Sequence, residues 1–228
     1  MQEECIVCKA PLIYLEQDEW MECELCHKKE LSKTRCQNGH YVCNDCHTKG
    51  LDTILSLCID ETSRNPIEIV RKMMDAPFCH MHGPEHHAIV PCVLLTAFRN
   101  NGEHMDYDAA LSEICKRAKQ VPGGTCGYWG VCGAAAGAGI FMSVMTGSSP
   151  LHKDAWPFPQ KLVSIILSRL ADVGGPRCCK RTSRIAIEEA VHFYSQFCSV
   201  NIPLSSITCK YCEDNRECIQ EDCPYYSE

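Results

Sequence analysis

The spacing of the cysteines constrains this chain more than any other feature. Cysteine occupies 20 of 228 positions, and much of it occurs as pairs separated by two residues. Two intervening residues make one turn, so both thiolates can reach the same metal ion. A chain of this length can also bury a core without disulfides. We therefore predict a metal-binding protein in a reducing compartment. The pairs are Cys5-x2-Cys8, Cys23-x2-Cys26, Cys43-x2-Cys46 and Cys209-x2-Cys212.

Residues 1–50 carry enough ligand-type side chains for two tetrahedral zinc ions. The segment has few aliphatic residues, so we expect metal binding to supply much of its folding free energy. The pattern leaves two arrangements open: sequential sites, built from the first four and the last four ligands, and cross-braced sites. One short β-type run, at 11–15, is expected here. The predicted ligands are Cys5, Cys8, Cys23, Cys26, Cys36, His40, Cys43 and Cys46.

Residues 51–204 show helical periodicity and no useful strand alternation, which predicts a mainly α fold with a helical core. Pro66 and Pro84 are typical of helix starts, and the run at 100–102 is typical of a helix end. A Gly/Ala-rich stretch within 130–147 predicts a buried core helix rather than a membrane span, because it is short and poor in large aliphatic residues. The helices are expected at 51–58, from 66, at 84–100, from 106 or 108 to 121, within 130–147, at 160–171 and at 178–200.

Residues 205–228 return to dense cysteine and form the third predicted segment, a metal-binding tail. Four sulfurs within fifteen residues predict another metal site. A final Cys-Pro is typical of ferredoxin ligation, although the spacing differs from the bacterial cluster run, so zinc and an iron–sulfur cluster both remain open. The predicted ligands are Cys209, Cys212, Cys218 and Cys223.

A histidine-rich run, Cys-His-Met-His-Gly-Pro-Glu-His-His, precedes and enters the helix that starts near Pro84. The positive end of a helix dipole disfavours imidazolium, which leaves neutral nitrogens able to bind a ligand. His82 and His86 are four residues apart and are the predicted functional pair. The alternative is a solvated helix cap in which one or two histidines are buried.

Two turns that contain glycine place cysteines at the starts of helices. Amide groups at a helix N-terminus favour a thiolate, so these sulfurs are candidates for redox or metal chemistry. Gly124, Gly133 and Gly137 would let another backbone or a cofactor approach closely, and Arg177 and Lys180 would lower thiol pKa values and hold an anion. The alternatives are a tightly packed small-residue helix with inert thiols and a solvated basic turn. The candidate catalytic thiols are Cys126, Cys132, Cys178 and Cys179.

Part of the core resembles a family of redox-active cysteine proteins that is named for its Cys, Gly-Cys-Ala-x-x-Gly, Cys and Cys motifs. The resemblance covers about residues 86–195 and rests on the run at 91–98, on Cys126 and Cys132 with their glycines, and on Arg177-Cys178-Cys179. It implies a small helical protein whose cysteines, here Cys92, Cys126, Cys132 and Cys178 or Cys179, have redox or iron–sulfur roles. The whole chain also looks like an uncharacterised cysteine-rich family of anaerobic microbes, which implies oxygen-sensitive chemistry.

Together these patterns predict a redox or thiol- or sulfur-transfer protein, an oxidoreductase or sulfur transferase if it is an enzyme. It would have structural zinc at the N-terminus and an iron–sulfur cluster or reactive dithiol in the core. One alternative is a zinc-stabilised interaction module; another is a zinc hydrolase or transferase that uses the histidine run, with Glu85 as general base. A redox partner or a small-molecule substrate is expected. The net charge of −7 argues against nucleic acid, and with no leader pattern we expect a cytoplasmic protein without membrane contact.

Overall fold

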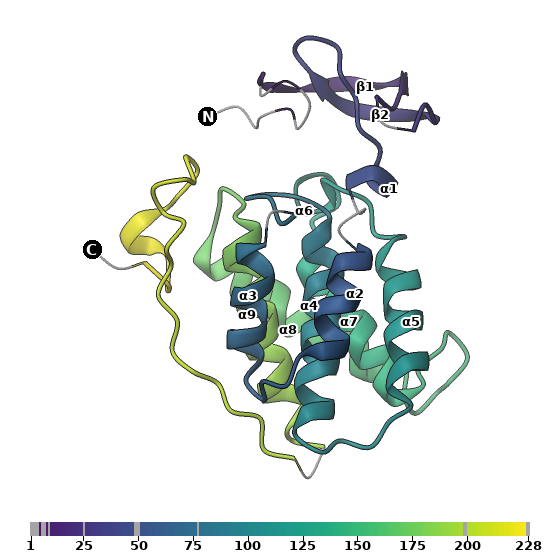
Figure 1. Cartoon of the computed structure of the whole chain (residues 1–228), viewed down its shortest axis with the longest axis vertical. Coiled ribbons are helices and arrows are strands. Elements are labelled where there is room, and N and C mark those ends of the chain that lie inside the picture. The colour runs from purple at the N-terminus through teal and green to yellow at the C-terminus, as the bar shows by residue number, and fades with distance from the viewer. Residues whose placement is uncertain are drawn as a thin grey trace. The chain divides into compact units, whose positions relative to one another are not determined.

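The computed structural model describes residues 5, 8, 10–24, 26–47, 51–76, 78–197 and 200–226, except for the side chains of 51 and 52. The chain divides into two compact units, Met1–Lys49 and Gly50–Glu228, so the cysteine-rich tail belongs to the same unit as the helices. The predicted class is confirmed: the chain is mainly helical, with one small two-stranded sheet near its start (Figure 1).

The N-terminal unit is an antiparallel hairpin followed by a short helix. Strand β1 (Leu12–Glu22) pairs with β2 (Lys29–Cys36), and α1 (Asn44–His47) follows. The sequence predicted a strand only at 11–15. The rest of β1 escaped prediction because it is largely polar and exposed, and it is paired through the backbone and through ion pairs such as Arg35 Nε to Glu19 Oε2 at 3.7 Å.

The second unit is built around one buried helix, α4. Its residues are buried from Glu85 to Phe98, and it packs against α2, α3, α5, α7 and α9. A helix forms at each expected place, although α9 ends at Tyr194 and not at residue 200, residues 198 and 199 lie outside the described part, and the short α6 is an additional turn. The elements are α2 (Leu51–Asp60), α3 (Pro66–Asp75), α4 (Glu85–Asn100), α5 (Tyr107–Ala118), α6 (Thr125–Tyr128), α7 (Gly133–Thr146), α8 (Pro157–Val173), α9 (Cys179–Tyr194) and the 3-10 turn η2 (Gln220–Asp222).

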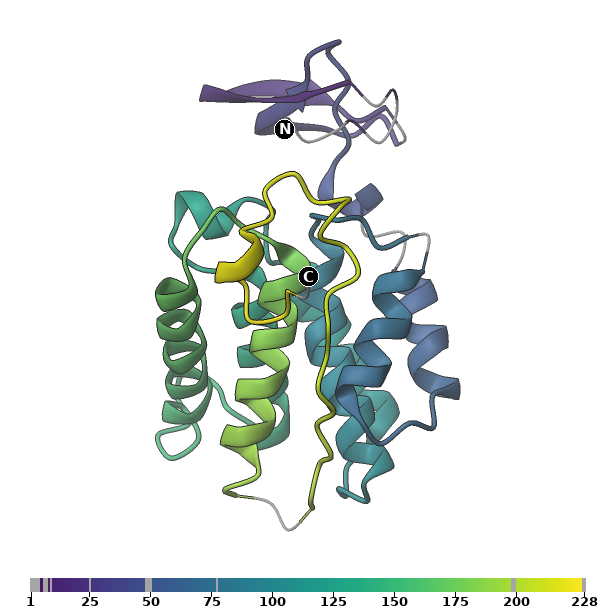
Figure 2. The same cartoon turned by 90° about the vertical axis from the view of Figure 1, so that its left-hand side faces the viewer.

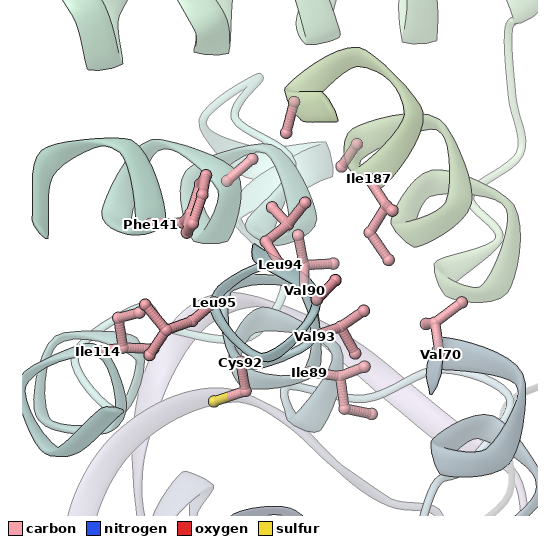
Figure 3. Packing of buried hydrophobic residues seen from close by; sticks show 14 of the residues in the cluster. Val70, Ile89, Val90, Cys92, Val93, Leu94, Leu95, Ile114, Phe141 and Ile187 are labelled. Carbon is pink, nitrogen blue, oxygen red and sulfur yellow. The ribbon is translucent and has the colours of Figure 1, made fainter. Parts of the chain in front are cut away.

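Aliphatic and aromatic side chains fill the space around α4 (Figure 3). Phe98 packs against Phe141 of α7 and Tyr194 of α9, with ring centroids 5.4 Å and 4.8 Å away, and those two rings contact each other at 5.6 Å. Edge-on aromatic contacts of this kind add to the free energy of apolar burial. The Gly/Ala-rich α7 is a core helix, as predicted, and no helix in the described part of the chain is long and apolar enough to cross a membrane.

Glycines in α7 let α4 and α7 approach closely. A Cβ placed on Gly137 would lie 2.6 Å from the carbonyl oxygen of His87 and 2.9 Å from Cδ of Pro91. A Cβ on Gly133 would collide with the imidazole of His87. Of the two occupants that the sequence left open, the space beside these two glycines therefore holds another helix and not a cofactor.

The C-terminal segment runs back along the helical unit beside α9 and ends near the start of that helix (Figure 2). Lys210 Nζ forms an ion pair with Asp75 of α3 at 2.7 Å, and Tyr211 hydrogen-bonds the same carboxylate. Glu217 lies 3.4 Å from Nε2 of His82. These contacts attach the tail to the end of the unit where α4 and α9 begin.

The close α4–α7 approach predicts that Gly137→Ala destabilises the chain. The added methyl has no room beside backbone and a proline ring, so we expect the free energy of unfolding to fall by about 1–3 kcal/mol. Gly127→Ala is the matched control, because a Cβ there meets nothing within 4 Å. Urea unfolding followed by circular dichroism measures both. Equal midpoints for Gly137→Ala and wild type would contradict this account of the packing.

Candidate metal centres

The eight predicted ligands of the N-terminal unit gather into two groups. In each group the ligand atoms all lie within 4.8 Å of one another, so each is able to hold a metal ion. The first and third ligand pairs along the sequence make one group, and the second and fourth make the other, which is the cross-braced alternative. The groups are Cys5, Cys8, Cys36 with His40, and Cys23, Cys26, Cys43 with Cys46.

Distances within these groups match a tetrahedral zinc site. Zinc–sulfur bonds of about 2.3 Å place two thiolates about 3.8 Å apart. Sγ of Cys8 lies 3.4 Å from Sγ of Cys36 and 3.2 Å from Nδ1 of His40. The backbone N–H of Asn38 donates to Sγ of Cys36 at 3.2 Å, a contact that stabilises negative sulfur. A backbone hydrogen bond from Ala10 lowers the pKa of Cys8 to about 6.

In the second unit, one cavity is lined by all four predicted tail cysteines together with a fifth sulfur, Cys178. Cys178 is the N-cap residue of α9, and its Sγ accepts the backbone N–H of Arg181 at 3.4 Å. In the tail, Tyr211 N donates to Cys209 Sγ and Gln220 N donates to Cys218 Sγ, each at 3.4 Å. The sulfur-lined cavity is formed by Cys178, Cys209, Cys212, Cys218, Cys223, Arg181, Arg184, Tyr211, Asn215, Ile219 and Tyr226.

Two arginines of α9 face this cavity from a buried position. Arg184 is 1% exposed, and its Nε and Nη1 have no hydrogen-bond partner within the described part of the chain. Arg181 donates through Nη2 to the carbonyl oxygens of Gly174 and Pro176 at 2.9 Å and 2.8 Å. A buried guanidinium without an anionic partner is costly, so a negative group in the cavity would stabilise the fold.

The histidine run forms a compact group, although its members differ from the pair predicted. Ligand atoms of Cys79, Glu85 and His86 lie within 4.8 Å of one another. His82 instead faces the tail residue Glu217. Burial lowers the pKa of His82, and that of His86 to about 4, so both imidazoles are neutral near pH 7. The sequence predicted neutral histidines from the helix dipole; burial is the larger cause.

The four candidate catalytic thiols do not form one compact centre. Among the described residues, no three of them have sulfurs within 4.8 Å of one another. Cys178 lines the tail cavity, whereas Cys179 accepts a hydrogen bond from the Gly83 backbone amide and interacts electrostatically with Cys132. Cys126 also interacts electrostatically with Cys132.

For the two thiols at the start of α9, burial has a larger effect on the pKa than the nearby cations have. It raises the pKa of Cys178, and that of Cys179 to about 12, although Arg181 and Arg177 act in the opposite direction. Arg177 and Arg181 act in the expected direction, but the effect of burial is larger, so the pKa values of both thiols are raised overall. Lys180 does not lower the pKa values of Cys178 and Cys179, because its Nζ instead donates a hydrogen bond to Sγ of Cys79 at 3.1 Å. Gly124 precedes the short α6 and has φ of +79°, a left-handed conformation that favours glycine. The backbone conformation therefore accounts for glycine at this position, and no cofactor is needed to explain it.

Fold and sites together define a mainly helical, cysteine-rich protein with groups of side chains able to hold metal ions. Residues 54–226 match the family described as "Family of unknown function (DUF5714)", and the chain belongs to this family. The matched region takes in the helices and nearly all of the tail, and it begins after the hairpin unit. A search of curated proteins and a search of solved structures found no match.

The cross-braced grouping predicts which double substitutions remove one metal ion and which remove two. Cys8→Ser with Cys36→Ser damages a single group, so the chain should lose one zinc ion. Cys8→Ser with Cys26→Ser damages both groups and should lose two. Native mass spectrometry with elemental analysis counts the ions. Sequential sites would reverse the two results, so each double variant is the control for the other.

Proposed function

We propose that this chain is a metal-dependent redox protein that carries an iron–sulfur cluster in the sulfur-lined cavity and structural zinc in the N-terminal unit. The observation that carries the proposal is the meeting of Cys178 with the four tail cysteines around one cavity beside buried arginines. Cysteine thiolates are the usual ligands of iron–sulfur clusters. A cluster with its thiolates is an anion, which is the partner that Arg184 lacks.

The spread of the sulfurs favours a cluster over a single ion. Four thiolates on one zinc must lie about 3.8 Å apart. The cavity cysteines belong to none of the groups whose ligand atoms lie within 4.8 Å, in a comparison limited to described residues. A polynuclear cluster separates its cysteine ligands by the width of the cluster. Thiols spread around a cavity therefore fit a cluster better than they fit a single metal ion.

The pKa values argue against a free reactive dithiol of Cys178 and Cys179 at the start of α9. The thiolate is the nucleophile in disulfide exchange, and a raised pKa reduces its population. Burial raises the pKa values of Cys178 and Cys179, so without metal both remain thiols near pH 7. Metal binding removes such protons outright. Metal ligation is therefore the better use of a buried sulfur here.

The cluster would act as a one-electron carrier. Held by the cavity cysteines, such a cluster would supply transfer of one electron from a reduced partner protein to an oxidised acceptor, and the protein would return to its starting state. The backbone N–H donors to Cys178, Cys209 and Cys218 and the buried arginines stabilise the more negative reduced state. These groups would thus set the reduction potential.

Anaerobically purified protein should contain iron and sulfide, absorb broadly in the visible region and bleach with dithionite. Cys218→Ser should lose most of this iron and colour while the N-terminal unit keeps its zinc, because only the cavity loses a thiolate. Iron, sulfide and zinc per chain are measured by elemental and colorimetric analysis.

Two controls accompany the Cys218 variant. Cys115→Ala removes a buried thiol that contacts Cys92 outside the cavity, and it should leave the iron unchanged. Cys126→Ser tests the core thiols that the sequence favoured. A colourless wild-type chain without iron after reconstitution, or iron that depends on Cys126 and not on Cys218, would refute a cluster in this cavity.

Removing the charge of Arg184 should shift the reduction potential without removing the cluster. Arg184→Met keeps the apolar volume but loses the cation that favours the reduced state, so the potential should become more negative by on the order of 50 mV. Redox titration followed by visible absorbance measures the shift. Arg117→Met is the matched control, because Arg117 pairs with Glu113 on α5 and does not line the cavity. Equal shifts in both variants would count against this role.

A further inference from the structure

A second group of buried ligand-type side chains lies outside the sulfur-lined cavity. We infer that Cys79, Glu85 and His86 bind a Zn²⁺ ion through three protein ligands, with the fourth position open to water. Their ligand atoms lie within 4.8 Å of one another, and Sγ of Cys79 is 3.6 Å from Nε2 of His86. Sulfur, nitrogen and carboxylate oxygen are all zinc ligands, and three protein ligands with an open fourth position are typical of catalytic zinc.

The carboxylate of Glu85 is the strongest sign of a missing cation. Its side chain is 0% exposed. Oε1 accepts the backbone N–H of His80 at 2.8 Å and lies 3.1 Å from Nδ1 of that residue, whereas Oε2 has no hydrogen-bond partner among the described atoms. A buried anionic oxygen without a partner is costly, and a bound metal ion would remove that cost.

The loop before α4 is shaped around this carboxylate. A Cβ on Gly83 would overlap the Glu85 carboxyl group, so only glycine lets the side chain fold back over the turn. Cys79, at the start of the segment 79–86, and His86, at its end, then both lie close to the Glu85 carboxylate. The three ligands are thus positioned locally, by one turn and the first residues of α4.

Lys180 does not supply the missing charge. Its Nζ donates to the carbonyl oxygens of Met74 and Cys79 at 3.0 Å and 3.3 Å, and to Sγ of Cys79 at 3.1 Å. These three acceptors use the three N–H groups of the ammonium. Lys180 therefore stabilises negative charge on the Cys79 sulfur, as a hydrogen bond to a metal-bound thiolate does, and leaves Oε2 of Glu85 to the ion.

His86 is oriented as a metal ligand. Nδ1 lies 3.1 Å from Oγ of Ser183 on α9, and donation of N–H there leaves the lone pair of Nε2 facing Cys79. Nε2 also lies 3.2 Å from the carbonyl oxygen of His80, which can only accept, so without metal Nε2–H donates to it. Zinc binding at Nε2 therefore moves this proton to Nδ1, where Oγ of Ser183 accepts it. When zinc binds, the thiol proton of Cys79 passes to solvent and the sulfur–metal bond takes its place.

The test counts zinc on the full chain, prepared anaerobically. Wild type should hold one zinc ion more than the two of the N-terminal unit. Cys79→Ser, Glu85→Gln and His86→Gln should each lose that one ion and keep the iron of the cavity. His87→Gln is the matched control, because His87 is buried on the same helix but its Nδ1 faces the carbonyl oxygen of Val121; this variant should keep the zinc.

The wild-type count decides the inference even if a variant fails to fold. Two zinc ions per chain in wild type, or equal loss in His87→Gln and His86→Gln, would overturn it. If the cavity held zinc instead of iron, the further ion would disappear with Cys218→Ser and survive Cys79→Ser, so the two proposals fail separately.

In the cobalt-loaded chain, azide should change the visible spectrum of the centre at Cys79, Glu85 and His86 alone, since the N-terminal groups already supply four ligands each. An unchanged spectrum would refute the open fourth position.

Discussion

Buried positive charge at the start of α9 is the constraint on which the second unit depends. Lys180, Arg181 and Arg184 are 2%, 4% and 1% exposed. Each needs acceptors or anions, because an uncompensated buried cation costs several kcal/mol. Backbone carbonyls satisfy part of this need for Lys180 and Arg181. Sulfur atoms supply the other contacts of these cations. Lys180 donates to Sγ of Cys79, and Arg184 lies beside the cavity thiols.

This constraint explains why the tail folds back onto the helices. The tail brings four cysteines to the arginines, and Tyr211 and Tyr225 place their rings 5.7 Å and 5.4 Å from the guanidinium carbon of Arg184. An aromatic face attracts a buried cation but does not neutralise its charge. Thiolates do, and they require metal to stay deprotonated where burial favours the thiol. A metal bound in the cavity, as proposed above, would therefore stabilise both the buried charge and the folded tail.

The sequence predicted the helices well because proline starts, glycine and asparagine ends and apolar periodicity are local signals. It also predicted the ligand-type residues of the N-terminal unit that gather into two groups able to hold a metal ion, because their pairs are separated by short turns. It could not choose between sequential and cross-braced sites, since that depends on how the hairpin brings Cys36 back to Cys8. For the same reason it grouped Cys178 with Cys179: adjacent residues at a helix start point in different directions, and only the packed tail shows which sulfur joins which partners.

Lys180 also connects the two proposed centres of the helical unit. Its ammonium bonds the Cys79 sulfur, and it lies 4.9 Å from the ring centroid of Tyr211, which lines the cavity. A change of charge at the cavity therefore acts across one aromatic ring on the cation that donates a hydrogen bond to the Cys79 sulfur. In a buried, low-dielectric region such an effect is weakly screened. Reduction of a cluster would strengthen the attraction of Lys180 toward the cavity and weaken its bond to Cys79, so the redox state of one site would bias the charge of a ligand at the other.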